Sequence, residues 1–143
     1  MITPTPAHLP AISAILAENG LPVDDLQKQD LALFLIELSQ GELIGVGGLE
    51  RCDEVALIRS VATARTKRGQ GIAGNLIQQL EIIAVSEGLG RLYLLTETAE
   101  LYFASKGYVP VDRANVPTSI KNSRQFSSLC SSSATVMFKR VGR

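Results

Sequence analysis

The sequence has few of the residues that bind metals or carry redox chemistry. Its 143 residues include only two cysteines, Cys52 and Cys130, and one histidine, His8. The cysteines stand far apart and form no metal-ligand or redox motif, which predicts reduced, buried thiols and no metal site. His8 falls in the first turn of a predicted helix at an exposed position, so we expect it on the surface and not as a catalytic base.

The sequence also lacks an excess of charge of one sign and long apolar runs. Lys+Arg and Asp+Glu each number 14, so the formal net charge is +0, which argues against a general nucleic-acid-binding surface. No apolar run approaches the length of a membrane span, and the first residues lack the basic-then-apolar order of a signal peptide. We therefore expect a cytoplasmic globular protein with one domain over residues 1–143 and no membrane or nucleic-acid partner. The sequence leaves a homodimer open.

The strongest local signal is a glycine loop between a strand and a long helix. Residues 57–62 have the apolar pattern of a buried strand, and over residues 72–87 apolar side chains recur every three or four positions, as on one helical face. Gly69 and Gly71 stand where this helix begins, so a ligand can approach the backbone and the free N–H groups of the first turn. Three cations beside the loop favour a diphosphate over a lone carboxylate: Arg65, Lys67 and Arg68.

The remaining elements follow from periodicity and turn residues. Helices are predicted over residues 6–19, 22–26, 72–87 and 99–106, and strands over residues 30–39, 42–50, 55–63, 91–96, 108–112 and 134–141. Residues 114–133 are predicted to be irregular, with one helical turn near Ile120. Glycines at 45, 47 and 48 weaken the strand 42–50, which then either borders a ligand cleft or is a distorted edge. The strand–helix–strand order around the glycine loop implies a parallel pair of strands with a right-handed crossover.

The order of elements and the loop together resemble the GNAT superfamily of acetyl-CoA-dependent N-acetyltransferases. The signature of that family is Arg or Gln, two residues, Gly, one residue, then Gly or Ala, which Arg68, Gly71 and Ala73 match. The resemblance covers nearly the whole chain. It implies an α/β (α+β) fold with a mixed, mostly antiparallel central sheet flanked by helices, and a splayed pair of parallel strands at the cofactor site.

A second motif supports the same resemblance. Helices at this place in the family commonly end in an aromatic pair, three residues, Gly and an aromatic, matched by Tyr102, Phe103, Gly107 and Tyr108. A nucleotide loop of the Walker type is disfavoured, because no Gly-Lys-Ser or Gly-Lys-Thr follows the glycines.

The resemblance implies acetyl-CoA as cosubstrate. Its diphosphate would rest on the backbone amides of residues 70–74, and its pantetheine arm would bind residues 61–63 like an added strand. The implied cofactor-binding residues are Val61, Ala62, Thr63, Arg68, Gly69, Gln70, Gly71, Ile72, Ala73 and Gly74.

Short stretches are similar to the arsenic-resistance N-acetyltransferase group: residues 57–62, residues 94–100, Pro117, Ile120 and parts of the tail 125–134. Amino-acid N-acetyltransferases of the glutamate type carry a similar tail. Both groups imply direct transfer of acetyl to the amine of a small amino-acid-like substrate, such as an arsenical or a related acidic analogue. The alternatives are a protein or peptide N-acetyltransferase and a non-catalytic acyl-CoA-binding regulator.

Two side chains are candidates for proton transfer. A free amine is mostly protonated at neutral pH, so a base or a water relay must remove its proton; we favour Glu97, acting through water, over Glu54. The thiol-protonating tyrosine of the family falls here at Phe103. Tyr102 is one place earlier and is the substitute candidate, with apolar packing as its alternative role. Without these groups, positioning and solvent would carry the reaction.

Arg59 interrupts an apolar strand and therefore needs an anionic partner. Alternation along the strand places it on one face with Leu57 and Val61. The partner is either a structural carboxylate, Glu50 or Glu97, or an acidic group of the substrate. The predicted substrate-binding residues are Arg59, Arg113 and Gln125.

Overall fold

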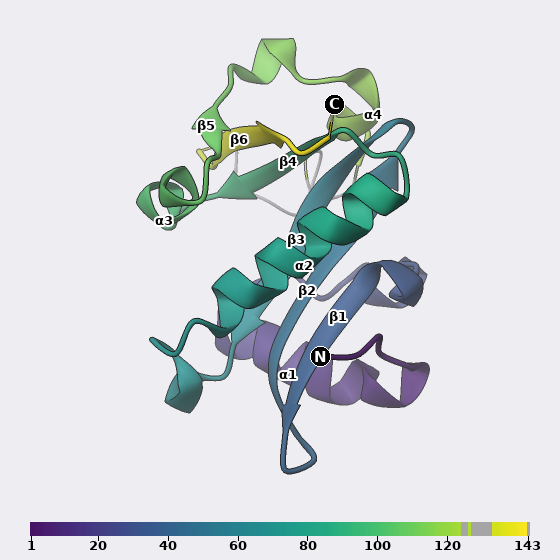
Figure 1. Cartoon of the computed structure of the whole chain (residues 1–143), viewed down its shortest axis with the longest axis vertical. Helices are drawn as coiled ribbons and strands as arrows, with labels where there is room; N and C mark the ends of the chain where they lie inside the picture. The colour runs from purple at the N-terminus through teal and green to yellow at the C-terminus, as the bar shows by residue number, and fades with distance from the viewer. Residues whose placement is uncertain (124–125, 127–132, 143) are drawn as a thin grey trace.

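The computed structural model describes residues 1–123, Phe126 and residues 133–142, and its six strands form one sheet in the order β1-β2-β3-β4-β6-β5 (Figure 1). The strands are β1 Phe34–Ser39, β2 Glu42–Cys52, β3 Val55–Thr63, β4 Arg91–Thr96, β5 Val109–Pro110 and β6 Thr135–Arg140. The α-helices are α1 Leu9–Glu18, α2 Ile72–Ser86, α3 Glu100–Ser105 and α4 Thr118–Lys121. All neighbouring strands are antiparallel except β3 and β4, which are parallel. The predicted mixed, mostly antiparallel sheet is therefore confirmed.

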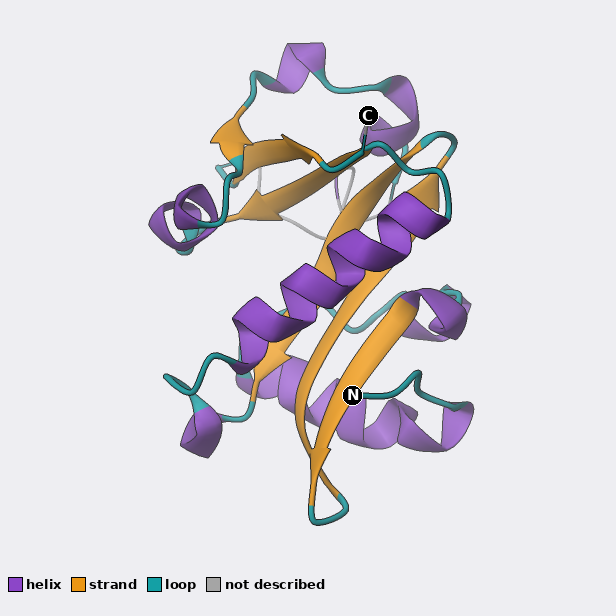
Figure 2. Ribbon diagram, viewed as in Figure 1, coloured by secondary structure: helices purple, strands orange, loops and turns teal. Residues whose placement is uncertain are grey.

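Helices cover both faces of the sheet (Figure 2). On one face α2 crosses β2 and β3, and its apolar side chains Leu76, Ile77 and Leu80 are buried against the sheet. On the other face α1 packs through Ile12, Ile15 and Leu16 in a separate apolar cluster. Because successive strand residues point to opposite faces, the long apolar runs of β1 and β3 serve both clusters at once.

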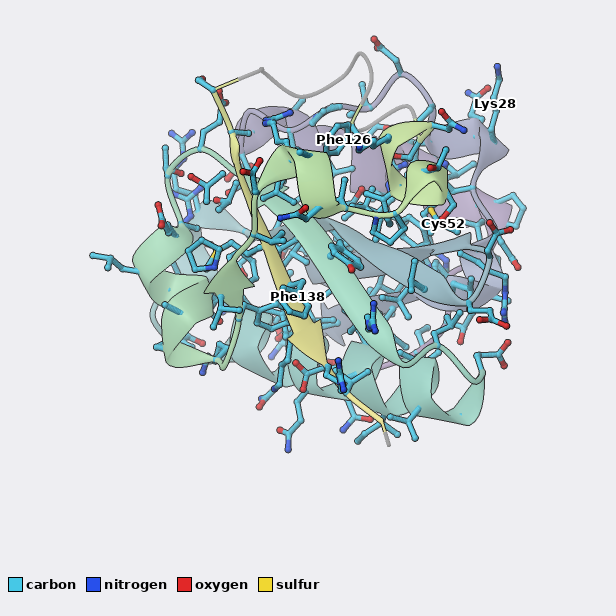
Figure 3. All side chains as sticks on the ribbon, turned by 90° about the horizontal axis from the view of Figure 1, so that it is seen from above. Lys28, Cys52, Phe126 and Phe138 are labelled. Carbon is cyan, nitrogen blue, oxygen red and sulfur yellow. The ribbon has the colours of Figure 1, made fainter. Side chains whose placement is uncertain are left out.

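A third apolar cluster lies at the C-terminal side, where α4 packs near β4 and β6. Figure 3 labels three of its residues, Cys52, Phe126 and Phe138. Burial raises the pKa of the Cys52 thiol to about 11, so this thiol stays protonated and inert at neutral pH, in agreement with the predicted buried cysteine. Cys130 lies outside the described residues.

Several predicted elements differ from the structure, and the strand predicted over 108–112 is reduced to β5, Val109–Pro110. The strand predicted from residue 30 begins only at Phe34, because Asp30 accepts a hydrogen bond from Ala32 N at 3.0 Å and starts a 3-10 turn, Leu31–Leu33. Residues 22–25 form no helix; a 3-10 turn, Leu26–Lys28, follows them instead. Within the described ranges, no helix combines the length and apolar character that crossing a membrane requires.

The glycines of β2 allow close packing on both faces of the sheet. The strand neither borders the cavity nor forms an edge, as the two predictions had it. β2 pairs with both β1 and β3, so it is not an edge strand, and it contributes no residue to the cavity described below. A Cβ at Gly45 would lie 2.7 Å from Ile72 Cγ2, and a Cβ at Gly48 would lie 2.5 Å from the Phe34 ring. The missing side chains let α2 approach one face of the sheet and let Phe34 fill the other.

The Gly48→Ala variant is expected to lose about 1–3 kcal/mol of unfolding free energy, because the added methyl overpacks a filled space. Gly90→Ala is the matched control, since a Cβ there meets nothing within 4 Å. Urea denaturation of both variants measures the difference. Equal stability of the two would contradict the packing role of Gly48.

Candidate functional site

β3 and β4 separate soon after they meet. They pair only at Ala56↔Leu92 and Leu57↔Tyr93, although β3 continues to Thr63 and β4 to Thr96. Beyond these pairs the edge of β3 that faces β4 has no strand partner among the described residues. This is the splayed parallel pair that the family resemblance implies.

A cavity of about 530 Å³ lies in the gap between the two strands. Its walls come from residues 58–61 of β3, residues 94–99 at the end of β4, residues 19–22 after α1, and from Phe103 and Ala134. The cavity thus reaches both the side of the sheet that carries α1 and the side that carries α2 and α3. Its size is in the usual range of small-molecule sites.

A β-bulge in β3 forms part of the cavity wall. Val46 pairs with Ala62 but Gly48 pairs with Arg59, so Gly47 faces two residues, Ser60 and Val61. Ser60 adopts a φ of 59° to make this bulge. The extra residue shifts the alternation of side chains between the two faces of the sheet for the residues that follow.

The shift corrects one prediction about the faces of β3. Val61 packs in the cluster under α2, together with Ile58, whereas Ala62 packs in the cluster under α1. Val61 therefore does not share a face with Leu57 and Arg59 as simple alternation predicts. The bulge places residues from both faces of β3 along one cavity.

Arg59 is the centre of a buried ion cluster. Its guanidinium donates to both carboxylate oxygens of Asp25, at 2.7 and 2.5 Å, and to Glu50 Oε1 at 2.9 Å, and Nε donates to Ser60 Oγ at 3.2 Å. The side chain is 0% exposed. Burial lowers the pKa of Arg59, but the hydrogen bonds and charges of Asp25 and Glu50 outweigh it and raise the pKa above its ordinary value.

The ion cluster also stabilises one wall of the cavity. Asp25 is only 2% exposed and lies three residues after the wall segment 19–22. Of the two predicted carboxylate partners of Arg59, Glu50 is confirmed, and Asp25 takes the place predicted for Glu97. Asp25 was not among the predicted partners, and the two adjacent acids at positions 24 and 25 are the signal that could have drawn attention to it. A substrate-binding role for Arg59 stays a prediction.

The glycine loop has the geometry of an anion site. Gly69 and Gly71 both have a φ of 81°, and Gly71 immediately precedes α2. The N–H groups of residues 72–74 point out of the first turn and have no intrahelical partner. Arg68 Nη2 donates to Asn19 Oδ1 at 2.6 Å, which ties the loop to the end of α1. Open amides beside cations fit the diphosphate of an acyl-CoA.

The two catalytic candidates lie in different places. Glu97 lines the cavity, and its Oε1 lies 3.5 Å from Ser133 Oγ. Tyr102 does not line the cavity, whereas Phe103, the next residue, does. Tyr102 instead faces the first turn of α2 near Gly74. Glu54, the weaker candidate, sits in the β2–β3 turn at the opposite end of β3 from the bulge.

The predicted substrate residues of the tail are placed only in part. Arg113 Nη2 donates at 2.7 Å to the carbonyl oxygen of Ala134, a cavity residue, and its guanidinium lies 5.1 Å from the centroid of the Phe126 ring. Arg113 is therefore adjacent to the cavity. Gln125 lies outside the described residues.

Comparison with known proteins gives a family and a set of similar folds. Residues 9–108 match the model of the Acetyltransferase (GNAT) family. Rv2747 from Mycobacterium tuberculosis, solved in complex with CoA and NLQ, is 18% identical with a TM-score of 0.82 over 97% of each chain. The N-acetylglutamate synthase of Neisseria gonorrhoeae, complexed with coenzyme A and N-acetyl-glutamate, is 18% identical with a TM-score of 0.85, over 99% of this chain but 35% of its own.

A further similar structure is that of an enzyme named for a protein substrate. The ribosomal-protein-S18-alanine N-acetyltransferase of Escherichia coli is 15% identical with a TM-score of 0.76, over 99% of this chain and 93% of its own. At such low identities these likenesses show the fold alone. They include amino-acid and protein acceptors on the same architecture, so the acceptor must be inferred from the site itself.

Proposed function

The chain belongs to the acetyltransferase (GNAT) family, and we propose that it transfers an acetyl group from acetyl-CoA directly to the amine of a small, amino-acid-like substrate. The observation that carries the proposal is the cavity between β3 and β4. It lies along the free edge of β3, and the chain runs from the end of that strand into the anion site at the start of α2. Donor and acceptor would therefore meet in the gap between the strands.

The donor side is formed by backbone more than by side chains. The amides of residues 72–74, with Arg68 beside them, would bind the diphosphate. The unpaired edge of residues 61–63 would hold the pantetheine arm as a strand holds its neighbour. Acetyl-CoA supplies an acetyl group activated as a thioester, and these contacts would place that group at the bulge in β3.

The acceptor side supports a small substrate. A volume of about 530 Å³ suits a metabolite-sized amine, and residues 19–22 form a wall that the Arg59 cluster holds in place. The amino-acid product bound to the similar synthase is in line with this class of acceptor. An arsenical or another acidic amino-acid analogue belongs to the same class and is included in the test below.

Direct transfer needs no covalent acetyl-enzyme. The described part of the chain places no cysteine at the cavity, and Cys52 is buried in a different apolar cluster. The protonated amine first loses one proton, and its nitrogen loses a second as the new C–N bond forms; the C–S bond breaks and one proton reaches the sulfur. Glu97, as a carboxylate on the cavity wall, would take the first proton through water, the second would pass to solvent, and solvent would supply the proton on sulfur.

The test is a substrate screen that follows release of the CoA thiol from acetyl-CoA. The panel contains glutamate and other amino acids, arsenical amines and a peptide with a free N-terminus. We expect turnover with amino-acid-like amines. Turnover with the peptide alone would favour the protein-acetylating alternative. A third outcome is that acetyl-CoA binds tightly by calorimetry but no amine gives thiol release above background. The protein would then be an acyl-CoA-binding regulator and not an enzyme.

A further inference from the structure

α3 brings two polar side chains to the first turn of α2. Gly74 is the third residue of α2, and a Cβ placed there would lie 3.2 Å from Lys106 Nζ and 3.5 Å from Tyr102 Oη. Lys106 Nζ also lies 5.5 Å from the centroid of the Tyr102 ring. The ammonium and the phenol therefore share the turn that carries the unpaired N–H groups of α2.

The charges at this turn are not balanced within the described structure. A helix N-terminus carries a partial positive charge, so an ammonium beside it is unfavourable unless an anion is also present. Arg68 and Lys67 add two cations in the preceding loop. None of these three basic side chains forms an ion pair with any carboxylate in the described part of the chain. A phosphate group placed here would offset all of them.

We propose that Lys106 and Tyr102 bind the phosphate groups of acyl-CoA, completing from α3 the anion site that begins on α2. The inference rests on the proposed function and adds two donor-side residues to it. Lys106 supplies a charge and Tyr102 an O–H donor, and the missing side chain of Gly74 lets both approach the turn. Burial raises the pKa of Tyr102, so its phenol stays protonated and able to donate at neutral pH. Tyr102 is thereby placed with the cofactor and not with the reacting sulfur.

The test compares three probes that share the pantetheine arm: CoA, 3′-dephospho-CoA and pantetheine. Calorimetry with Lys106→Gln is expected to show a Kd for CoA about 10- to 100-fold above wild type, the range for loss of a hydrogen bond to a charged group. The Kd for pantetheine is expected to stay unchanged. An equal loss with CoA and 3′-dephospho-CoA assigns Lys106 to the diphosphate, and a loss with CoA alone assigns it to the 3′-phosphate.

Lys28→Gln is the matched control, because Lys28 is an exposed lysine in the 3-10 turn Leu26–Lys28, and it should bind all three probes as wild type does. An unchanged preference for CoA over pantetheine in Lys106→Gln would overturn the inference and leave the proposed function intact. Wild-type protein that binds CoA no better than pantetheine would overturn both.

Tyr102→Phe separates binding from catalysis. We expect a raised Kd for CoA and a wild-type kcat once acetyl-CoA is saturating. A reduced kcat at saturation with an unchanged Kd would instead make Tyr102 the proton donor to sulfur and remove it from the phosphate site.

Discussion

Replacing Arg59 by methionine is expected to lower the free energy of unfolding by about 3–5 kcal/mol, because it leaves buried acidic groups without their cation. Asp25 is 2% exposed and the side chain of Glu50 21% exposed, so water cannot fully replace the guanidinium. Methionine keeps most of the volume and removes only the charge and the donors. Urea denaturation at neutral pH measures the change.

Arg51→Met is the control for this variant. Arg51 pairs with Glu87 at 2.7 Å, but the two side chains are 44% and 46% exposed, so the loss should stay within about 1 kcal/mol. If Arg59→Met is as stable as this control and instead raises the KM for an acidic acceptor but not for acetyl-CoA, then Arg59 is the substrate anchor that its place in the strand also allows.

The elements around the glycine loop could be predicted from the sequence because their signals are local. α2 has a continuous apolar face, and the predicted limits of β4 coincide with the observed strand, Arg91–Thr96. The start of β1 could not be predicted in the same way. In the sequence Leu31 and Leu33 extend the apolar run of the strand, but the chain turns here because Asp30 accepts hydrogen bonds from Ala32 N on its side chain and from Leu33 N on its carbonyl oxygen.

The donor side of the site likewise depends on local signals, whereas the acceptor side depends on contacts between distant residues. The anion site depends on two glycines with positive φ and on the first turn of a helix, all within a few residues. The ion cluster joins Asp25 to Arg59 across 34 positions, and no spacing rule specifies such a contact. The bulge at Ser60 depends on Gly47 of the neighbouring strand, so alternation within β3 alone gave the wrong face for Val61.

Glu97→Gln is expected to lower kcat by about 10²- to 10⁴-fold, the usual contribution of a general base. Glutamine keeps the shape of the side chain on the cavity wall but does not accept the proton of the amine. The Kd for acetyl-CoA should stay unchanged, since Glu97 belongs to the acceptor side of the proposed site. The defect should shrink as the pH rises, because a growing share of the acceptor amine is then already neutral. Thiol release at saturating substrates, measured across pH, gives both results.

Glu100→Gln provides the comparison, since Glu100 is also exposed, opens α3 three residues later and does not line the cavity. Its carboxylate lies 3.4 Å from Thr135 Oγ1, so its loss removes a surface contact only, and kcat should stay close to wild type. A wild-type kcat for Glu97→Gln would show that no carboxylate on this wall takes the proton. The rate would then come from holding the amine and the thioester together in the gap between β3 and β4, with solvent as the base.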